Sequence, residues 1–406
     1  MTNGAPLHIL IANNIYPPIM AGGAELIVQY LAEGLVENGN RVTVVSTCGP
    51  EMEPYPVEHR NGVEIIRFFP RNIYWHWTRG ERPGYQKALW HMRDAWNTDA
   101  GRRFSAIIDE SKPDFLHSHL IDGMSATLWR RARQHHIPVI HTAHDYHLLC
   151  PRSLMLTRSL KICATPQLPC RSYRKWHLHT TRDITLFCSP SQFLIEQHKA
   201  AGLAVKRTAV IRNGIPLPVF KPKARTENAP RRFLFAARLT IEKGCQVLLD
   251  AMKLMPTELN FELCIAGKGA FEEAFREAAS LDPRIRLLGY IQDDAKIKTF
   301  CEADCLILPS LWYENAPVVI IEAATYGLGV IASRIGAIPE FISNEKNGLL
   351  FEPGNAASLA AAMQRIIKED GLLKLFASNS RDLANTSSVD QMVDSYLEQY
   401  KLLYAA

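Results

Sequence analysis

The fold is decided by the stretch Cys305-Leu306-Ile307-Leu308-Pro309-Ser310 and by the segment after it, Glu314-Asn315-Ala316-Pro317-Val318-Val319-Ile320-Ile321-Glu322. The first stretch is an apolar run of strand length that ends at a proline. Pro317 suits the first turn of a helix, so Glu314 lies just before that helix and Glu322 lies within it. A buried strand that leads directly into a helix is the repeating unit of a parallel α/β sheet.

The same alternation runs along the whole chain and predicts two parallel sheets with helices on their faces. In the first half, strands are expected at 7–13, 41–47, 63–69, 114–119, 138–143, 184–189 and 207–212, and helices at 24–38, 98–111, 122–136 and 191–200. In the second half, strands are expected at 233–238, 261–266, 285–289, 305–309 and 330–333, and helices at 243–255, 270–280, 293–302, 317–326, 337–343 and 355–369.

The length of 406 residues suits two domains. Prolines and charges crowd together at 214–231, which is typical of an interdomain linker. We therefore expect an N-terminal domain over 1–213, a C-terminal domain over 232–385 and a final helix over 386–406. Two such domains would place a ligand cleft between the carboxyl ends of their sheets.

The composition excludes several classes of protein. Apolar residues make up 47% and charged residues 21%, which excludes a disordered, collagen-like or coiled-coil chain. The net charge of +5 is too small to indicate nucleic-acid binding, although it suits anionic ligands or an anionic membrane surface. No apolar run reaches the roughly 18 residues of a membrane span, and residues 1–14 do not resemble a signal peptide. The nine cysteines, an odd number, favour a reducing cytoplasm.

Two motifs at expected strand ends suit an anionic ligand. Gly22 and Gly23 stand where the first strand leads into a helix, so the backbone can approach a ligand and free N–H groups attract anions. Arg238 and Lys243 lie five residues apart after a later strand, and together they would clamp a diphosphate. A plain turn and a solvated charged loop are the structural alternatives.

The two glutamates of the opening segment add a third motif. Eight residues separate Glu314 from Glu322, roughly 12 Å along a helix. The carboxylate pair of a glycoside hydrolase is only about 5–9.5 Å apart. The spacing therefore favours two contacts along an extended ligand, with a helix cap plus a surface glutamate as the alternative.

With Gly348-Leu349-Leu350 added, the order and spacing of these motifs resemble the family 4 retaining glycosyltransferases of the GT-B fold, which build bacterial polysaccharides or glycolipids. The resemblance implies two Rossmann-like domains facing each other across a cleft. It also implies a C-terminal helix that returns to the N-terminal domain. Ala237, Pro317 and Gly329 depart from residues that are frequent in the family, which affects only the fine geometry of the donor site.

The resemblance also assigns roles to residues on the donor side. Arg238 and Lys243 would hold the donor diphosphate, Glu314 would meet hydroxyls of the transferred sugar, and Glu322 would meet the ribose. The remaining donor-side positions are the glycines and backbone amides of Gly22, Gly23, Gly267, Asn315, Ala316 and Val318. A plain turn is an equal alternative for the segment that contains Gly267.

Histidines end two expected strands, at Leu116-His117-Ser118-His119 and at His141-Thr142-Ala143-His144-Asp145. By resemblance, His119 lies near the anomeric carbon, and His144 and Asp145 line the acceptor side. Hydrogen-bonded structural histidines are the alternative. A metal site is a further alternative, but the cations and helix termini already supply the positive charge that a metal would bring.

Three other stretches carry reactive or amphipathic side chains. Cys150, Cys163 and Cys170 fall in one Pro- and Arg-rich loop, where free thiols are favoured over zinc because no fourth ligand is evident. The stretches 71–79 and 171–176 combine cations with aromatic residues, which suits a membrane interface or a sugar. Ordinary packed loops are the alternative for both.

The expected activity is transfer of a hexose from a UDP- or GDP-linked sugar to a saccharide or lipid-linked acceptor, with retention of configuration. The nucleotide sugar is a co-substrate, and neither a cofactor nor a metal is expected. The expected location is the cytoplasm, with peripheral contact at the inner face of the plasma membrane. A nucleotide-sugar epimerase on the same fold and a non-catalytic scaffold are the alternatives.

Overall fold

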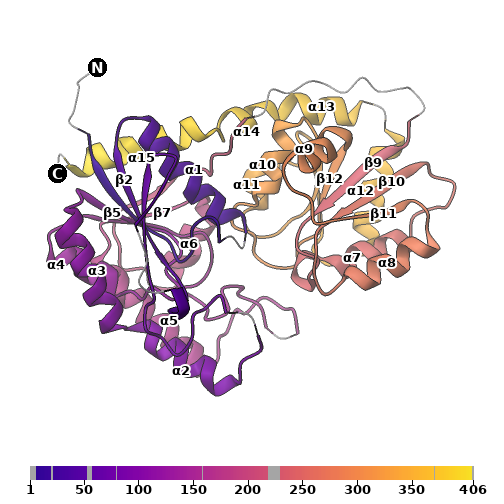
Figure 1. The fold of residues 1–406 in the computed structure, drawn as a ribbon. Coiled ribbons are helices and arrows are strands. Elements are labelled where there is room, and N and C mark those ends of the chain that lie inside the picture. Colours follow the sequence, from indigo (N-terminus) through magenta and orange to yellow (C-terminus); the bar gives the residue numbers. More distant parts are fainter. Residues whose placement is uncertain are drawn as a thin grey trace. The chain divides into compact units, whose positions relative to one another are not determined.

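The computed structural model of the chain describes residues 6–19, 22–52, 57–78, 80–157, 159–217, 229–369 and 371–404. They form two α/β units (Figure 1). Unit 1 comprises Met1–Met155, Cys163–Gly214 and Val389–Ala406, and unit 2 comprises Leu156–Ile162 and Ile215–Ser388. The prediction of two largely parallel sheets covered by helices is confirmed. Most of the linker predicted at 214–231, namely 218–228, lies outside the described residues.

Unit 1 is built on an eight-stranded sheet of order β3-β4-β2-β1-β5-β6-β7-β8. Its strands are β1 His8–Ala12, β2 Arg41–Thr47, β3 Glu58–Arg60, β4 Val63–Phe68, β5 Phe115–Ser118, β6 Val139–Thr142, β7 Leu186–Ser189 and β8 Thr208–Val210. All neighbours pair in parallel except β3 and β4. Strand order reverses between β1 and β5, and ligands of open α/β sheets bind beyond the carboxyl ends at such a point.

The helices of unit 1 include one from the C-terminus. They are α1 Gly23–Glu37, α2 Gly84–Ala95, α3 Thr98–Ser111, α4 Thr127–Gln134, α5 Leu168–Thr180, α6 Gln192–Ala200 and α15 Val389–Tyr404. α15 packs on α1 at Gly34, where an added Cβ would lie 2.7 Å from Val393. The hydroxyl of Tyr400 lies 2.7 Å from Nδ1 of His117 in β5, and both residues are buried. The C-terminal helix is therefore part of the core of unit 1.

Unit 2 is built on a six-stranded parallel sheet of order β11-β10-β9-β12-β13-β14. Its strands are β9 Arg231–Ala236, β10 Phe261–Ala266, β11 Ile285–Gly289, β12 Cys305–Leu308, β13 Gly329–Ser333 and β14 Leu349–Phe351. Its helices are α7 Cys245–Lys253, α8 Glu272–Leu281, α9 Asp293–Glu302, α10 Val318–Thr325, α11 Ile338–Phe341, α12 Ala356–Lys368, α13 Leu372–Asn379 and α14 Arg381–Asn385. Here the strand order reverses between β9 and β12.

One prediction is wrong. Residues 171–176, together with Cys170, lie in helix α5 rather than in a loop. Pro169 occupies the first turn of α5, where a proline is tolerated because its missing N–H would have no helical partner. The helix then buries His177 and Leu178 against unit 1. Helices α2, α13 and α14 and strands β3 and β14 were not predicted either.

Candidate functional site

The predicted diphosphate clamp lies at the carboxyl end of the sheet in unit 2. Arg238 and Lys243 follow β9, and Glu314 follows β12, so these three residues flank the point where strand order reverses. Gly267 follows the neighbouring strand β10, and Glu322 lies in α10, the helix after β12. The structure thus brings the predicted donor-side residues of unit 2 to one edge of one sheet, where α/β proteins bind ligands.

Glu314 and Lys243 form a largely buried ion pair at this edge of the sheet. The Nζ of Lys243 lies 2.7 Å from Oε1 of Glu314, and the two side chains are 16% and 5% exposed. The same oxygen accepts hydrogen bonds from Oγ of Ser310 at 2.6 Å and from Nε1 of Trp312 at 2.8 Å. Oε2 receives no hydrogen bond from any described residue, so it is the oxygen that can accept a ligand hydroxyl.

Two glycines fix the loops that carry this pair. Gly244 has φ +78°, and an added Cβ would lie 1.8 Å from the carbonyl oxygen of Pro309. Gly336 has φ +58°, and its Cβ would lie 2.5 Å from the carbonyl oxygen of Glu314. That carbonyl also accepts a hydrogen bond from the amide of Ala337 at 2.8 Å. The role of Gly336 was not predicted, because a left-handed φ beside a distant loop leaves no local pattern in the sequence.

Arg238 differs from Lys243 in its exposure. Its side chain is 61% exposed, and its guanidinium lies 3.7 Å from the carboxylate of Glu242. The loop beneath it is held by Gly267, whose added Cβ would lie 1.9 Å from the carbonyl oxygen of Ala237. Arg238 is therefore a solvent-facing cation on a fixed backbone, which suits recognition of an anion.

Glu322 has a partner that was not predicted. Its carboxylate lies 2.5 Å from Nζ of Lys296 on α9. Asn315 and Ala316 lie between Glu314 and the start of α10 at Val318. A ligand that contacts Glu322 would therefore meet an ion pair rather than an isolated carboxylate.

In unit 1, two histidines meet at the other predicted site. His119 follows β5 and His144 follows β6, and Nδ1 of His119 lies 3.0 Å from Nε2 of His144. Burial lowers the pKa of His144 to about 4. Burial, together with the neighbouring His117 and His144, lowers the pKa of His119 well below its usual range. Both rings are thus neutral at pH 7, with one donating to the other. Nε2 of His119 is buried and has no hydrogen-bond partner among the residues that the structure describes.

A water-sized cavity of about 10 Å³ adjoins this pair. It is lined by His119, Leu120, Ile121, His141, Ala143, His144, Asp145, His147 and Leu148. Burial raises the pKa of Asp145 to about 6, and its Oδ1 accepts a hydrogen bond from the amide of His147 at 2.8 Å. The predicted acceptor-side residues His144 and Asp145 therefore share one small polar cavity with His119.

Further buried carboxyl groups, which were not predicted from the sequence, lie in unit 1. Burial and then the nearby Asp122 raise the pKa of Asp94, on α2, to about 7, although the amide of Gly123 donates to it. Asp122 itself pairs with His76 at 3.1 Å and accepts from Asn14 at 2.7 Å. Asp94 and Asp122 come from different parts of the chain, so no sequence pattern could predict that they lie close together.

The predicted pair Gly22 and Gly23 lies in unit 1 at the start of α1. Gly22 is the residue before the helix, and Gly23 is its first residue. Glu25 lies in the same first turn, and an added Cβ on Gly22 would lie 3.5 Å from its carboxylate. An anion at this terminus would therefore meet a carboxylate as well as free N–H groups.

The family follows from comparison with known proteins. The family named "Glycosyltransferase Family 4" matches residues 21–218, and the family named "Glycosyl transferases group 1" matches residues 219–383. This chain belongs to the family 4 glycosyltransferases. The glycosyltransferase is 31% identical over 339 residues to an uncharacterized 42.6 kDa protein in the cps region of Klebsiella pneumoniae, across 82% of this chain and 87% of that protein.

Two further similarities extend over most of the glycosyltransferase. The phosphatidyl-myo-inositol mannosyltransferase of Mycobacterium leprae is 26% identical over 373 residues, across 88% of this chain and 87% of the relative. The crystal structure of Anabaena Alr3699/HepE in complex with UDP-glucose matches with a TM-score of 0.69 and 18% identity, across 97% of this chain and 99% of that one. The fold of the glycosyltransferase is therefore the predicted GT-B fold.

Cysteines of the glycosyltransferase are all free thiols. Burial, with Cys150 and Cys163 nearby, raises the pKa of Cys170. Within the part of the chain that the structure describes, no three His, Cys, Asp or Glu side chains are grouped so as to hold a metal ion. Among the described helices, none is both long and apolar enough to cross a membrane.

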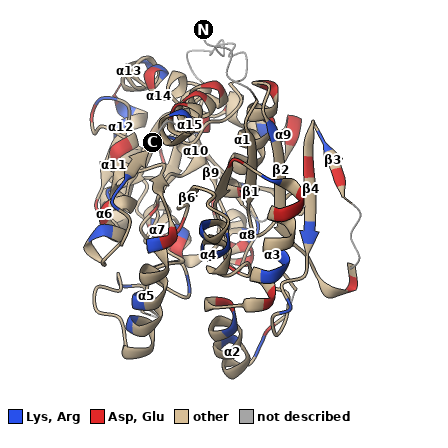
Figure 2. Cartoon of the chain, turned by 90° about the vertical axis from the view of Figure 1, so that its left-hand side faces the viewer, with Lys and Arg blue, Asp and Glu red and all other residues tan. Residues whose placement is uncertain are grey.

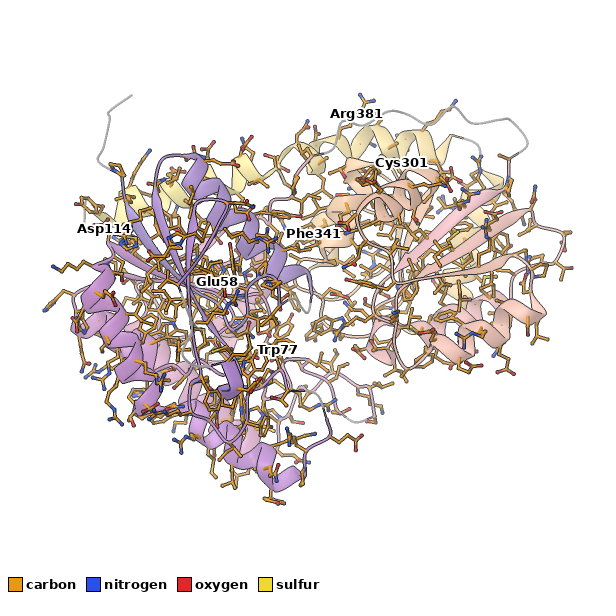
Figure 3. The ribbon with its side chains drawn as sticks, viewed as in Figure 1. Glu58, Trp77, Asp114, Cys301, Phe341 and Arg381 are labelled. Atoms are coloured by element: carbon orange, nitrogen blue, oxygen red, sulfur yellow. The ribbon has the colours of Figure 1, made fainter. Side chains whose placement is uncertain are left out.

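The aromatic rings of the stretch 71–79 mostly pack within unit 1. Trp75 donates from Nε1 to the hydroxyl of Thr47 at 3.0 Å, and Tyr74 stacks on Trp90 with ring centroids 6.0 Å apart. Trp77, labelled in Figure 3, meets His76 edge-on at 5.4 Å. Arg79 lies outside the described residues. The rings of Tyr74, Trp75 and Trp77 are therefore only partly buried, and the exposed residues of the stretch are Arg71, Ile73, His76 and Thr78.

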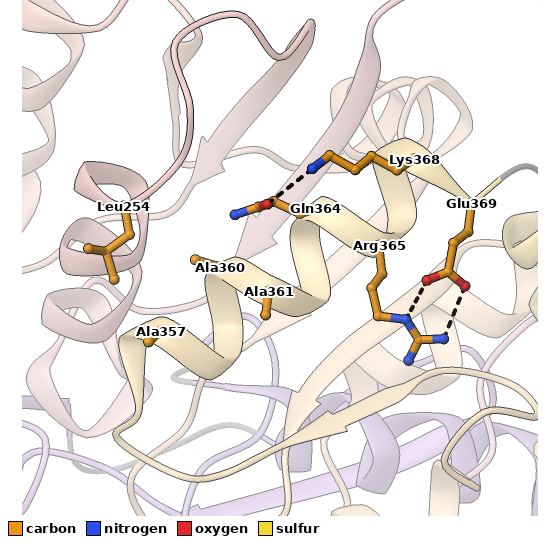
Figure 4. A pocket seen from close by; sticks show the side chains of 8 residues that line it. All are labelled: Leu254, Ala357, Ala360, Ala361, Gln364, Arg365, Lys368 and Glu369. Carbon is orange, nitrogen blue, oxygen red and sulfur yellow. Dashed lines mark hydrogen bonds and ion pairs between the residues drawn. The ribbon is translucent and has the colours of Figure 1, made fainter.

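A hollow on unit 2 lies away from the strand ends (Figure 4). It is lined by Leu254, Ala357, Ala360, Ala361, Gln364, Arg365, Lys368 and Glu369. Its arginine, Arg365, is held by Glu345 and Glu369, each at 2.6 Å. Because the guanidinium is already paired and most of the other residues belong to α12, the hollow is not a candidate for the transfer site.

Proposed function

We propose that this glycosyltransferase moves a hexose from a UDP- or GDP-linked sugar to a saccharide or lipid-linked acceptor, with retention of anomeric configuration. The observation that carries the proposal is the buried Lys243–Glu314 pair where strand order reverses in unit 2, with the exposed Arg238 five residues before Lys243. Cations for a diphosphate thus adjoin a carboxylate oxygen for sugar hydroxyls. The UDP-glucose complex of the similar Anabaena protein supports a nucleotide-sugar donor.

On the donor side, Arg238 and Lys243 would contact the diphosphate, and Oε2 of Glu314 would accept hydroxyls of the sugar. Glu322 would meet the ribose and would exchange part of its pairing with Lys296 for that contact. The predicted backbone contacts would come from Gly22, Gly23, Gly267, Asn315, Ala316 and Val318. Such an extended ligand would use the two glutamates at separate points, which their spacing along the chain favours.

In the proposed reaction, the bond between the anomeric carbon and the diphosphate oxygen breaks, and its electron pair stays on that oxygen. The acceptor oxygen forms the new bond on the same face of the sugar, and its proton passes to the departing diphosphate. Arg238 and Lys243 would stabilise the charge that develops there, and losing such a contact typically costs about 2.7–4 kcal/mol in the transition state. The neutral His119 would lie near the anomeric carbon. No metal or cofactor is required in this scheme.

On the acceptor side, we propose that the acceptor contacts His144 and Asp145 of unit 1 and the cavity beside them. The similar phosphatidyl-myo-inositol mannosyltransferase supports an acceptor carried on a lipid. An acceptor of that kind would place the protein in the cytoplasm, in peripheral contact with the inner face of the plasma membrane.

A thermal-shift screen of nucleotides and nucleotide sugars tests the donor assignment. A ligand that binds the folded protein at 100 times its Kd stabilises it by about 2.7 kcal/mol. The best donor is then incubated with and without saccharide and lipid-linked acceptors, and release of nucleoside diphosphate and sugar-bearing product is followed. Acceptor-dependent release supports the proposal. Conversion of the nucleotide sugar alone would indicate an epimerase, and binding without turnover would indicate a scaffold.

A further inference from the structure

One surface of unit 1 exposes large apolar side chains in a regular pattern. On α2, Tyr85, Leu89 and Met92 are 66%, 44% and 65% exposed, and Trp96, the residue after the helix, is 40% exposed. Their spacing of four, three and four residues puts them on one stripe of the helix. The opposite side of α2 is packed into the unit through the buried Trp90. The apolar stripe therefore faces away from the core that holds α2 in place.

Helix α5 continues this surface. The rings of Trp96 and Trp176 meet edge-on with centroids 5.7 Å apart, and Nε1 of Trp176 donates to the carbonyl oxygen of Ala95 at 3.1 Å. Figures 1 and 2 both draw α2 and α5 near one another. We define the α2–α5 surface by its exposed apolar residues and cations, which are Tyr85, Leu89, Met92, Trp96, Leu168, Trp176, Arg93, Arg171 and Lys175.

Exposed charge on these two helices is of one sign. Lys87 and Arg93 are exposed on α2, and Arg171 and Lys175 are exposed on α5. α5 contains no acidic residue, and the one acidic residue of α2, Asp94, is buried. Figure 2 shows Lys and Arg in blue on both helices. A cationic, tryptophan-bearing helical surface with an apolar stripe has the composition of a segment that lies in the membrane interface.

We propose that the α2–α5 surface docks the protein on an anionic lipid bilayer, with the apolar stripe at the boundary of headgroups and acyl chains and the cations Arg93, Arg171 and Lys175 against lipid phosphates. A bilayer matches the exposed apolar stripe and the exposed positive charge of both helices together. The proposal revises the membrane contact expected at 71–79, where Tyr74 and Trp75 are partly buried and have partners within unit 1. Of the stretch 171–176, the proposal retains the exposed Arg171, Lys175 and Trp176. It leaves out Arg174, because the guanidinium of that residue turns inward and donates to the carbonyl oxygen of Leu149.

Vesicle co-sedimentation of the full chain tests this surface without any donor or acceptor. We expect binding to vesicles of equal parts phosphatidylglycerol and phosphatidylcholine at low salt, weak binding to phosphatidylcholine alone, and release at high salt. Replacing Arg93, Arg171 and Lys175 by Ser should lower the partition coefficient about fivefold per cation. Leu89→Ser with Met92→Ser should lower it tenfold or more, because two apolar side chains no longer enter the interface.

A matched control removes two exposed leucines from unit 2. Leu281 and Leu375 are 81% and 45% exposed, and replacing both by Ser should leave vesicle binding unchanged. All the substituted side chains are exposed, so circular dichroism and melting should match the unmodified protein. Nucleotide-sugar binding should also be unchanged, so failure of this proposal is distinguishable from failure of the proposed function.

Three outcomes would overturn the docking proposal. The first is an unmodified protein that ignores anionic vesicles at low salt. The second is equal loss of binding in the unit 2 control. The third is a stable dimer in sedimentation velocity that Leu89→Ser with Met92→Ser dissociates, without vesicle binding by either form, which would make the surface an interface between copies of the chain.

Discussion

Replacing Lys243 by Met would separate the structural and catalytic parts of the diphosphate clamp. Met keeps the apolar stem but removes the ammonium that lies 2.7 Å from the nearly buried carboxylate of Glu314. Breaking a buried ion pair by removing one partner typically costs about 3–5 kcal/mol, because the other charge is left uncompensated. Ser310 and Trp312 still donate to Glu314, so we expect a loss near the lower end, about 3 kcal/mol.

Arg238→Met is the matched comparison, because Arg238 is 61% exposed and has one ion pair at 3.7 Å. Its loss should change stability by no more than about 0.5 kcal/mol. For a unit of this size, each kcal/mol shifts Tm by about 2–4 °C, so Lys243→Met should melt about 6–12 °C lower and Arg238→Met within about 2 °C of the unmodified protein. Differential scanning calorimetry measures both shifts.

Activity should fall in both variants despite their different stabilities. Assayed well below both transitions, each should lose about 100-fold or more in turnover, since each removes a cation from the departing diphosphate. In the double variant Lys243→Met with Glu314→Gln, part of the lost Tm should return, because the uncompensated charge is gone. An unchanged Tm in Lys243→Met would refute the buried pair, and normal turnover in both single variants would refute the clamp.

Three further predictions concern the sugar contacts, metals and pH. Glu314→Gln should mainly lower kcat, because its contact is to the reacting sugar, whereas Glu322→Gln should mainly raise the donor KM; identical kinetic changes in the two variants would contradict these roles. Turnover should persist in excess chelator, and complete loss restored by a divalent cation would revive a metal site at the histidines. Burial raises the pKa of Asp94 from 3.8 to about 7, so the native state binds the extra proton and its stability falls as pH rises between those values. The Tm of Asp94→Asn, relative to the Tm of the unmodified protein, should therefore rise from pH 5 to pH 8. A difference between the two Tm values that stays constant over this range would show that Asp94 does not titrate in it.

The parallel sheets could be predicted because buried strands are short runs rich in apolar and β-branched residues, such as Val42-Thr43-Val44-Val45 in β2. Helix α5 could not be predicted in the same way. Its sequence is rich in Arg and His, and its buried residues His177 and Leu178 do not form an apolar stripe. Helix α2 is similar, because its most regular apolar stripe faces away from the core.

The donor loops could be predicted because Arg238, Lys243 and Glu314 each follow a recognisable strand, and equivalent strand ends share one edge of a sheet. The environment of Glu314 could not, since Ser310, Trp312 and Gly336 act through hydrogen bonds and a left-handed φ that only the folded loops define. The same holds for Lys296, which reaches Glu322 from another helix.

The central claim is that unit 2 binds a nucleoside diphosphate through side-chain cations. Isothermal titration calorimetry with UDP and with GDP, in excess chelator, tests it most directly on the unmodified protein and on Arg238→Met, whose fold should be intact. The account predicts saturable binding of at least one of the two nucleotides without metal, weakened tenfold or more in the variant. Failure of the unmodified protein to bind either nucleotide, or equal affinity in Arg238→Met, would contradict it.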